Sequence, residues 1–250
     1  MSRRTVRLVL EYDGSDFGGW QRQDNRITVQ EVLEGALARH LGEPVTTVAA
    51  GRTDAGVHAL GQTVSFRTES RIPPGGILHG ANVHLPDTVA IREVADASPD
   101  FHAQRDAVGK HYRYRILTER VRRPVAGRFA TRIGTPLDDR RMGEAAARLV
   151  GTHDFSSFRN AGSVETSPVR TLTRLDITRE DEYLSLDFEA DGFLYRMVRN
   201  LVGTLLLVGR GAMDPETVGE VLLAADRCRA GPAAPAGGLC LVRVFYRNDA

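Results

Sequence analysis

The N-terminal part of the chain alternates between two hydrophobic periodicities, and this alternation is the strongest constraint on its fold. Four segments have the alternation or the short apolar run of strands: residues 5–12, 45–50, 62–67 and 89–94. Two have the helical spacing of apolar residues: residues 28–41 and 73–84. The order strand, helix, strand, strand, helix, strand is the ferredoxin-like arrangement, which RNA-binding domains also use.

The C-terminal part repeats this mixture of strands and helices. Strands are predicted at residues 108–117, 172–178, 183–190 and 239–246. Helices are predicted at residues 138–150, 193–208 and 214–225. We therefore expect an α+β chain of two halves, residues 1–105 and 106–250, whose sheets could join with a cleft between them.

The composition excludes several classes of protein. Apolar residues make up 42% and charged residues 26% of the chain, as in soluble globular proteins. The most apolar run, residues 194–208, contains two arginines and an asparagine, so no membrane span is expected. Cys228 and Cys240 are the only cysteines, which excludes a disulfide scaffold and a cysteine-based zinc site. With no signal-peptide pattern at the N-terminus, we expect a cytoplasmic protein.

Residues 51–62 form an unusual stretch between two predicted strands. Its three glycines permit tight turns and close approach to a ligand. Asp54 is its only carboxylate, and Arg52 lies two positions earlier, where an opposite charge would keep that carboxylate ionised. An ionised carboxylate in such a loop can be a nucleophile, a base or a metal ligand, or can simply form a turn.

A basic stripe runs from Arg105 to Arg132. Its cations are Arg105, Lys110, Arg113, Arg115, Arg120, Arg122, Arg123, Arg128 and Arg132, and its anions are only Asp106 and Glu119. This imbalance favours a polyanionic partner, although anions from elsewhere could fold back onto the stripe. Tyr112 and Tyr114 alternate with arginines here, a pattern that suits RNA and ordinary half-exposed strands equally.

Residues 51–59, Gly-Arg-Thr-Asp-Ala-Gly-Val-His-Ala, resemble the signature of the tRNA pseudouridine synthase A family. Six further segments resemble the same family in the same order: residues 12–14, 19–23, 82–86, 151–158, 197–200 and 238–241. Residues 101–105 resemble its Phe-His-Ala-Arg segment, but Gln104 stands where the arginine is expected and Arg105 follows. The resemblance covers nearly the whole chain.

The resemblance implies the pseudouridine synthase fold, in which two ferredoxin-like halves share a mainly antiparallel mixed sheet with a central cleft. It implies isomerisation of uridine to pseudouridine at positions 38 to 40 of the tRNA anticodon stem-loop. It also implies that no cofactor or metal takes part and that the protein is a homodimer that binds the anticodon arm of tRNA.

The resemblance also assigns roles to individual residues. Asp54 would be the nucleophile, Arg199 the cation that keeps it ionised, and Arg52 a contact to the substrate backbone. Tyr112 would hold the base, and Leu239 and Leu241 would line an apolar pocket. The expected RNA contacts are Arg52, Phe101, His102, Arg105, Arg120 and Arg123. Whether Asp54 attacks C1′ or C6, or abstracts a sugar proton, stays open at this point.

Two readings from other classes compete with this one. The chain could be an RNA-binding module without activity, but such a module has no use for a carboxylate close to phosphates. It could also be a metal-dependent phosphohydrolase that uses Asp13, Asp16 and Asp54, although no convincing ligand cluster is visible in the sequence.

Overall fold

The computed structural model describes residues 3–162 and 167–247, and its contacts divide the chain into two compact units. Unit 1 comprises the residues up to Val108 together with those from Cys240 onwards, and unit 2 comprises Gly109–Leu239. The predicted halves, residues 1–105 and 106–250, place the last strand in the second half, whereas its contacts are grouped with unit 1.

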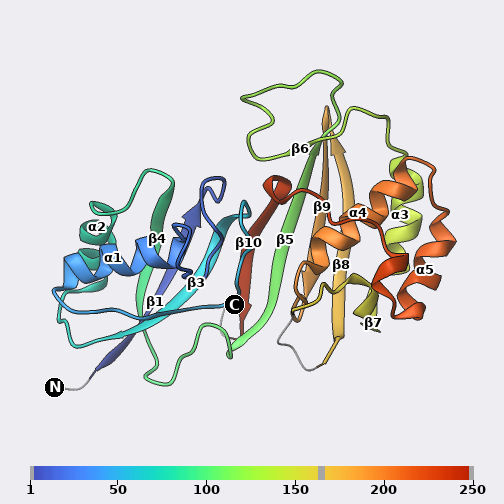
Figure 1. Cartoon of the computed structure of the whole chain (residues 1–250). Helices are drawn as coiled ribbons and strands as arrows, with labels where there is room; N and C mark the ends of the chain where they lie inside the picture. The colour runs from blue at the N-terminus through green and yellow to red at the C-terminus, as the bar shows by residue number, and fades with distance from the viewer. Residues whose placement is uncertain (1–2, 163–166, 248–250) are drawn as a thin grey trace. The chain divides into compact units, whose positions relative to one another are not determined.

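Unit 1 has the predicted ferredoxin-like order. Its elements are β1 (Arg4–Tyr12), α1 (Val29–Leu41), β2 (Thr47–Ala49), β3 (His58–Thr68), α2 (Pro74–Asn82), β4 (Val89–Ala97) and, from the end of the chain, β10 (Leu239–Tyr246) (Figure 1). β1 pairs antiparallel with both β3 and β4, and β2 pairs antiparallel with β3. The resulting order β4-β1-β3-β2 is that of RNA-binding domains.

The boundaries of α1 follow from its capping residues. Thr28 Oγ1 accepts a hydrogen bond from the Glu31 N–H at 3.4 Å, which begins the helix. Gly42 ends it in the left-handed conformation with φ 72°, and its N–H donates to Ala38 O. The helix buries an apolar stripe that includes Leu33 and Leu37.

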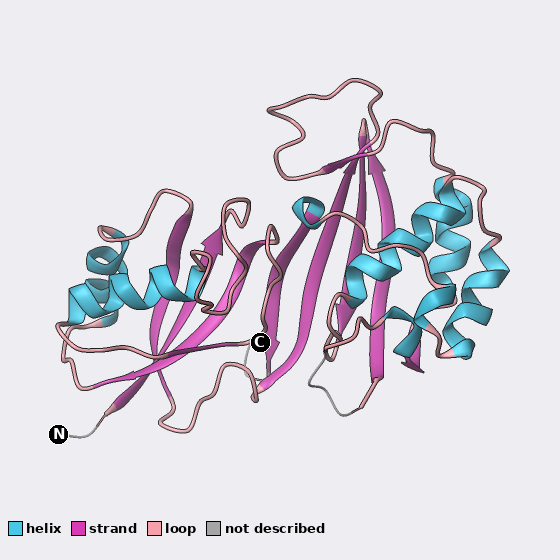
Figure 2. Cartoon of the chain, viewed as in Figure 1, coloured by secondary structure: helices cyan, strands magenta, loops and turns pink. Residues whose placement is uncertain are grey.

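Unit 2 combines long antiparallel strands with three helices (Figure 2). Its elements are β5 (Ala107–Leu117), β6 (Thr131–Arg132), α3 (Asp139–Ala147), β7 (Gly151–Asp154), β8 (Val169–Glu180), β9 (Tyr183–Ala190), α4 (Met197–Gly209) and α5 (Pro215–Ala224). β9 pairs antiparallel with β5 and β8, and β8 pairs antiparallel with β7. α3 packs against α4, α5 and β8, so that the helices cover one face of these strands.

Several boundaries differ from the sequence-based expectation, and two of them concern the family segments at residues 51–59 and 197–200. α4 begins at Met197 rather than at residue 193, because Arg196 adopts the left-handed conformation with φ 59° and a right-handed helix cannot continue through it. β3 begins at His58, so the last residues of the stretch 51–62 belong to a strand and only its first part is a loop.

The last strand, β10, lies beside the start of β3. The two strands pair in parallel, with Cys240 opposite His58 and Leu241 opposite Ala59. Their backbones approach so closely that a Cβ on Gly61 would lie 2.4 Å from Val242 O. β10 therefore lies directly beside the strand that leaves the Asp54 loop.

Candidate active site

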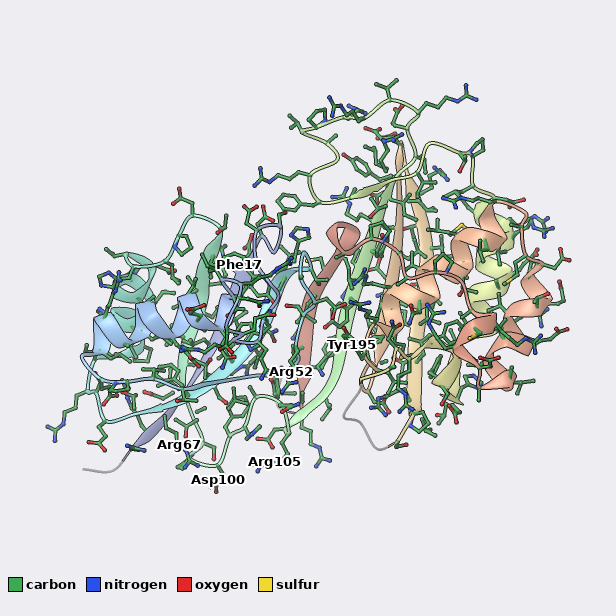
Figure 3. The ribbon with its side chains drawn as sticks, in the orientation of Figure 1. Phe17, Arg52, Arg67, Asp100, Arg105 and Tyr195 are labelled. Atoms are coloured by element: carbon green, nitrogen blue, oxygen red, sulfur yellow. The ribbon has the colours of Figure 1, made fainter. Side chains whose placement is uncertain are left out.

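The loop that carries Asp54 has an inner and an outer side. Thr53 and Val57 are buried, Arg52 and Ala55 are exposed, and Asp54 is half-buried between them. Arg52, labelled in Figure 3, is exposed, and its contact to a substrate backbone stays a prediction. A half-buried carboxylate can act as a nucleophile, and an exposed cation beside it can contact an anionic partner.

Glycines determine the shape of this loop. The Val57 N–H donates to Asp54 O at 3.1 Å, which closes a four-residue turn, and Gly56 supplies the positive φ of 79° at its third position. The neighbouring loop packs on it without side chains in between. A Cβ on Gly14 would lie 2.0 Å from Val57 O, and one on Gly19 would lie 2.7 Å from Thr53 O.

The loop formed by residues 13–20 is therefore part of the site; both ends of this loop resemble the family, but no role in the site was predicted for them. The Trp20 N–H donates to Thr53 O at 3.0 Å and ties the two loops together. The signal in the sequence was the pair of glycines beside an aromatic residue, since glycine is required where two backbones touch.

Leu241 is the one predicted pocket residue that the structure places beside the Asp54 loop within unit 1. It is fully buried on β10, opposite Ala59, which is the last residue of the family signature. Leu239, which is also buried, belongs to unit 2.

Tyr112 lies in β5 of unit 2 and is 7% exposed. Its ring meets the ring of Phe193 edge to face, with centroids 5.2 Å apart. Phe193 was not identified as a site residue from the sequence; its position just before the motif at residues 197–200 was the available signal.

Arg199 is half-buried on α4. Its Nε donates to Ala234 O at 2.7 Å, and the Ala234 N–H donates back to Arg199 O at 2.9 Å. Arg199 and Tyr112 belong to unit 2 and Asp54 to unit 1, so the pairing of Arg199 with Asp54 stays a prediction.

Phe101, His102 and Arg105 line one groove of about 540 Å³ in unit 1, together with Arg67 of β3. Figure 3 labels Arg67 and Arg105 at this groove. Arg105 is exposed, but its Nε contacts Asp106 Oδ1 at 3.3 Å. Phe101 packs on Tyr246, with ring centroids 5.3 Å apart. The RNA contacts expected here stay predictions.

Part of the basic stripe is neutralised by anions that are distant in sequence. Arg113 Nε contacts Asp187 Oδ1 at 2.9 Å, and Arg123 forms an ion pair with Glu182. Arg120, in contrast, is exposed and has no ion pair among the residues that the structure describes. The alternative that anions from elsewhere fold back onto the stripe therefore holds for Arg113 and Arg123, whose partners lie in β9 and in the turn before it.

The phosphohydrolase reading gains no support from the described residues. Asp13 Oδ1 accepts hydrogen bonds from the N–H and the hydroxyl of Ser15, at 3.0 and 2.6 Å, as in a turn. Asp16 is exposed. Within residues 3–162 and 167–247, no group of three or more His, Cys, Asp or Glu side chains is placed to hold a metal ion. In the same ranges, no helix has the length and apolar character to cross a membrane.

A family model and named relatives agree on one family. A family model described as tRNA pseudouridine synthase matches residues 8–106 and 145–247. A protein of Syntrophotalea carbinolica named tRNA pseudouridine synthase A is 47% identical over 241 residues, which are 96% of both chains. Proteins of the same name from Geobacter sulfurreducens and Methylococcus capsulatus are 44% and 45% identical, over 97% and 98% of this chain and 100% and 90% of theirs. A solved Cbf5-Nop10-Gar1 complex aligns with a TM-score of 0.42 and 11% identity, over 96% of this chain and 50% of its own.

Proposed function

Because this chain belongs to the tRNA pseudouridine synthase family, we propose that it isomerises uridine to pseudouridine at positions 38 to 40 of the tRNA anticodon stem-loop. The observation that carries the proposal is Asp54, half-buried on a glycine-shaped loop with Arg52 exposed beside it. The family signature, residues 51–59, coincides with this loop and the first residues of β3.

The reaction sets the requirements on the site. The bond between C1′ and N1 of the uridine breaks, the uracil turns, and a bond between C1′ and C5 forms. The proton on C5 is lost and N1 gains one, so the nucleotide is neither oxidised nor reduced. We assign the nucleophilic carboxylate to Asp54, the cation that keeps it ionised to Arg199, and the ring that holds the base to Tyr112. Leu239 and Leu241 supply the apolar wall.

RNA binding must offset a cost that the chemistry imposes. The target base has to leave the stack to reach Asp54, which costs a few kcal/mol. Contacts to the phosphates provide the compensating free energy. We assign these contacts to Arg52, Arg120 and Arg123, and to the groove formed by Phe101, His102 and Arg105.

The test is the release of tritium from anticodon-arm RNA labelled at C5 of uracil. We expect release by the wild-type protein and none by Asp54→Asn, which removes the nucleophile but no phosphate contact, so RNA binding should persist. Asp87→Asn is the matched control, because it removes an exposed carboxylate of the same unit outside both loops of the site, and it should react at the wild-type rate. A wild-type protein that binds the RNA without releasing tritium would instead be a passive RNA-binding module. Wild-type turnover by Asp54→Asn would refute the assigned role of Asp54.

The same proposal extends to the assembly and the location of the protein. We propose a cytoplasmic homodimer in which each tRNA contacts both subunits. Analytical ultracentrifugation should give twice the mass of the 27.4 kDa chain, and a monomer at all concentrations would contradict the dimer.

A further inference from the structure

Two side chains that have no assigned role in the reaction form hydrogen bonds with polar groups of the Asp54 loop. Gln62 Nε2 donates to Gly51 O at 2.6 Å, and the Tyr12 hydroxyl hydrogen-bonds to Thr53 Oγ1 at 2.8 Å. These contacts hold two residues on the N-terminal side of Asp54. The turn closed by Val57 holds the C-terminal side, and the neighbouring loop packs on both sides, at Thr53 and at Val57.

Tyr12 and Gln62 come from adjacent strands and point into the interior of unit 1. Tyr12 is the last residue of β1 and is 3% exposed, and Gln62 lies in β3 and is fully buried. The register between the two strands shifts here, since Leu10 pairs with Gln62 but Tyr12 pairs with Ala59. Such β-bulges redirect side chains and are frequent beside active sites.

The burial of Gln62 has a free-energy cost. Its Oε1 is buried and has no hydrogen-bond partner among the described residues. A buried amide left half-paired destabilises the folded protein, and an apolar side chain of similar size would avoid this cost. A buried polar group without a partner is unfavourable for stability alone. Its presence in a side chain that contacts the Asp54 loop points to a role in function.

Tyr12 is suited to a fixed hydrogen bond rather than to proton transfer. Burial raises the pKa of its hydroxyl far above the usual value, and contacts with Thr53 and Gln62 offset only part of the rise. The hydroxyl therefore stays protonated at neutral pH. The protonated hydroxyl can therefore maintain its hydrogen bond with Thr53 Oγ1 at this pH.

We propose that Tyr12 and Gln62 are positioning residues that hold the Asp54 loop in its reacting geometry. The inference rests on the proposed role of Asp54. A nucleophile must lie within about 0.5 Å of its productive position, and a displacement of about 1 Å can cost about 100-fold in rate. The two side chains fix the backbone that carries the carboxylate without touching the substrate.

Gln62→Met separates positioning from stability. Methionine keeps the volume and removes the unpaired Oε1, but it also removes the donor to Gly51 O, so the two effects oppose each other and the unfolding temperature should change little. The single-turnover rate of tritium release should nevertheless fall about 10- to 100-fold, with the Kd for the RNA within about twofold of the wild-type value. A wild-type rate in this variant would overturn the proposal.

A double-mutant cycle gives the second test. Tyr12→Phe should slow single turnover and lower the unfolding temperature, because Thr53 Oγ1 is left buried without this partner. Adding Thr53→Val removes the second polar group and should restore stability, but the rate should stay as low as in the single variant. A rate that recovers together with the stability would show that the pair is only structural.

Tyr183→Phe is the control for losing a tyrosine hydroxyl. That hydroxyl donates to Ala126 O at 2.8 Å in unit 2, and its loss should leave the rate unchanged. The wild-type protein separates the two hypotheses. If it releases no tritium, the proposed function fails; if it is active and both Gln62→Met and Tyr12→Phe match it, only the positioning inference fails.

Discussion

At the scale of single residues, the motif at residues 197–200 combines different tasks. Asn200 is fully buried, and its Nδ2 donates to Phe158 O at 2.7 Å and to Asn160 Oδ1 at 2.8 Å. Its Oδ1 accepts from Arg227 at 3.0 Å. Asn200 therefore ties α4 to two other segments of unit 2, whereas its neighbour Arg199 is half-buried and is assigned to catalysis.

Asn200→Leu should destabilise the protein, because each buried group left without its partner costs about 1–3 kcal/mol. Urea unfolding should show a lower midpoint, while the Kd for anticodon-arm RNA stays at the wild-type value under native conditions. Wild-type stability with weakened RNA binding would instead place Asn200 among the RNA contacts.

Asp187 makes stability depend on pH. Burial favours its protonated form, but hydrogen bonds from His111 and Arg113 outweigh this effect and lower the pKa of the carboxyl. A carboxyl with a lowered pKa in the folded state stabilises the protein above its unfolded pKa of about 4, and that contribution is lost as the pH falls through the folded value. Asp187→Asn should therefore lower the unfolding temperature at pH 7 and reduce its dependence on pH below about 5. An unchanged pH dependence would contradict this account.

At the scale of elements, the segment between β5 and β6 carries arginines of the basic stripe that differ in their ion pairs. Figure 1 shows it as a long loop beyond the end of β5. Arg120 and Arg122 are exposed there without an ion pair among the described residues, whereas Arg123 is held by Glu182. To bind a phosphate, Arg123 must therefore lose its ion pair with Glu182, whereas Arg120 and Arg122 lose no ion pair with the described residues.

Arg120→Ala should reduce the slope of log K against log salt by about 0.7 to 0.9, the value of one phosphate contact. Arg123→Ala should have a smaller effect, because Arg123 must first leave Glu182. Glu182→Gln is the matched variant, and by releasing Arg123 it should make the salt dependence steeper. RNA binding titrations at several salt concentrations measure the slopes of the wild type and of the three variants. If all three variants have the wild-type slope, the loop is an ordinary solvated surface.

At the scale of the whole molecule, the sequence predicted what depends on local pattern. The order of strands and helices in unit 1 and the helix start at Thr28 were confirmed, because periodicity and capping are local properties. The start of α4 was wrong, since nothing local showed that Arg196 is left-handed. The contribution of Tyr12 and Gln62 was not predicted, because it depends on which buried side chains the strands bring beneath the loop.

The contact between β3 and β10 should be necessary for a complete unit 1. Gly61→Ala would push Val242 O away, because the new Cβ would lie only 2.4 Å from it. We expect a lower unfolding temperature and slower tritium release. Gly35→Ala is the control: no atom lies near its Cβ on the exposed side of α1, so this change should stabilise the helix by about 1 kcal/mol. Equal stability of Gly61→Ala and wild type would contradict the proposed importance of this contact.

The return of β10 to unit 1 has a consequence for synthesis in the cell. The chain leaves unit 1 at Val108 and comes back only at Cys240, so β10 emerges from the ribosome after every other described element. Unit 2 can begin to fold while β3 still lacks its parallel neighbour. More than a hundred codons are thus translated between the end of the first part of unit 1 and the synthesis of β10, which pairs with β3. A nascent chain stalled before residue 239 would present the family signature with the start of β3, at His58 and Ala59, lacking its parallel neighbour.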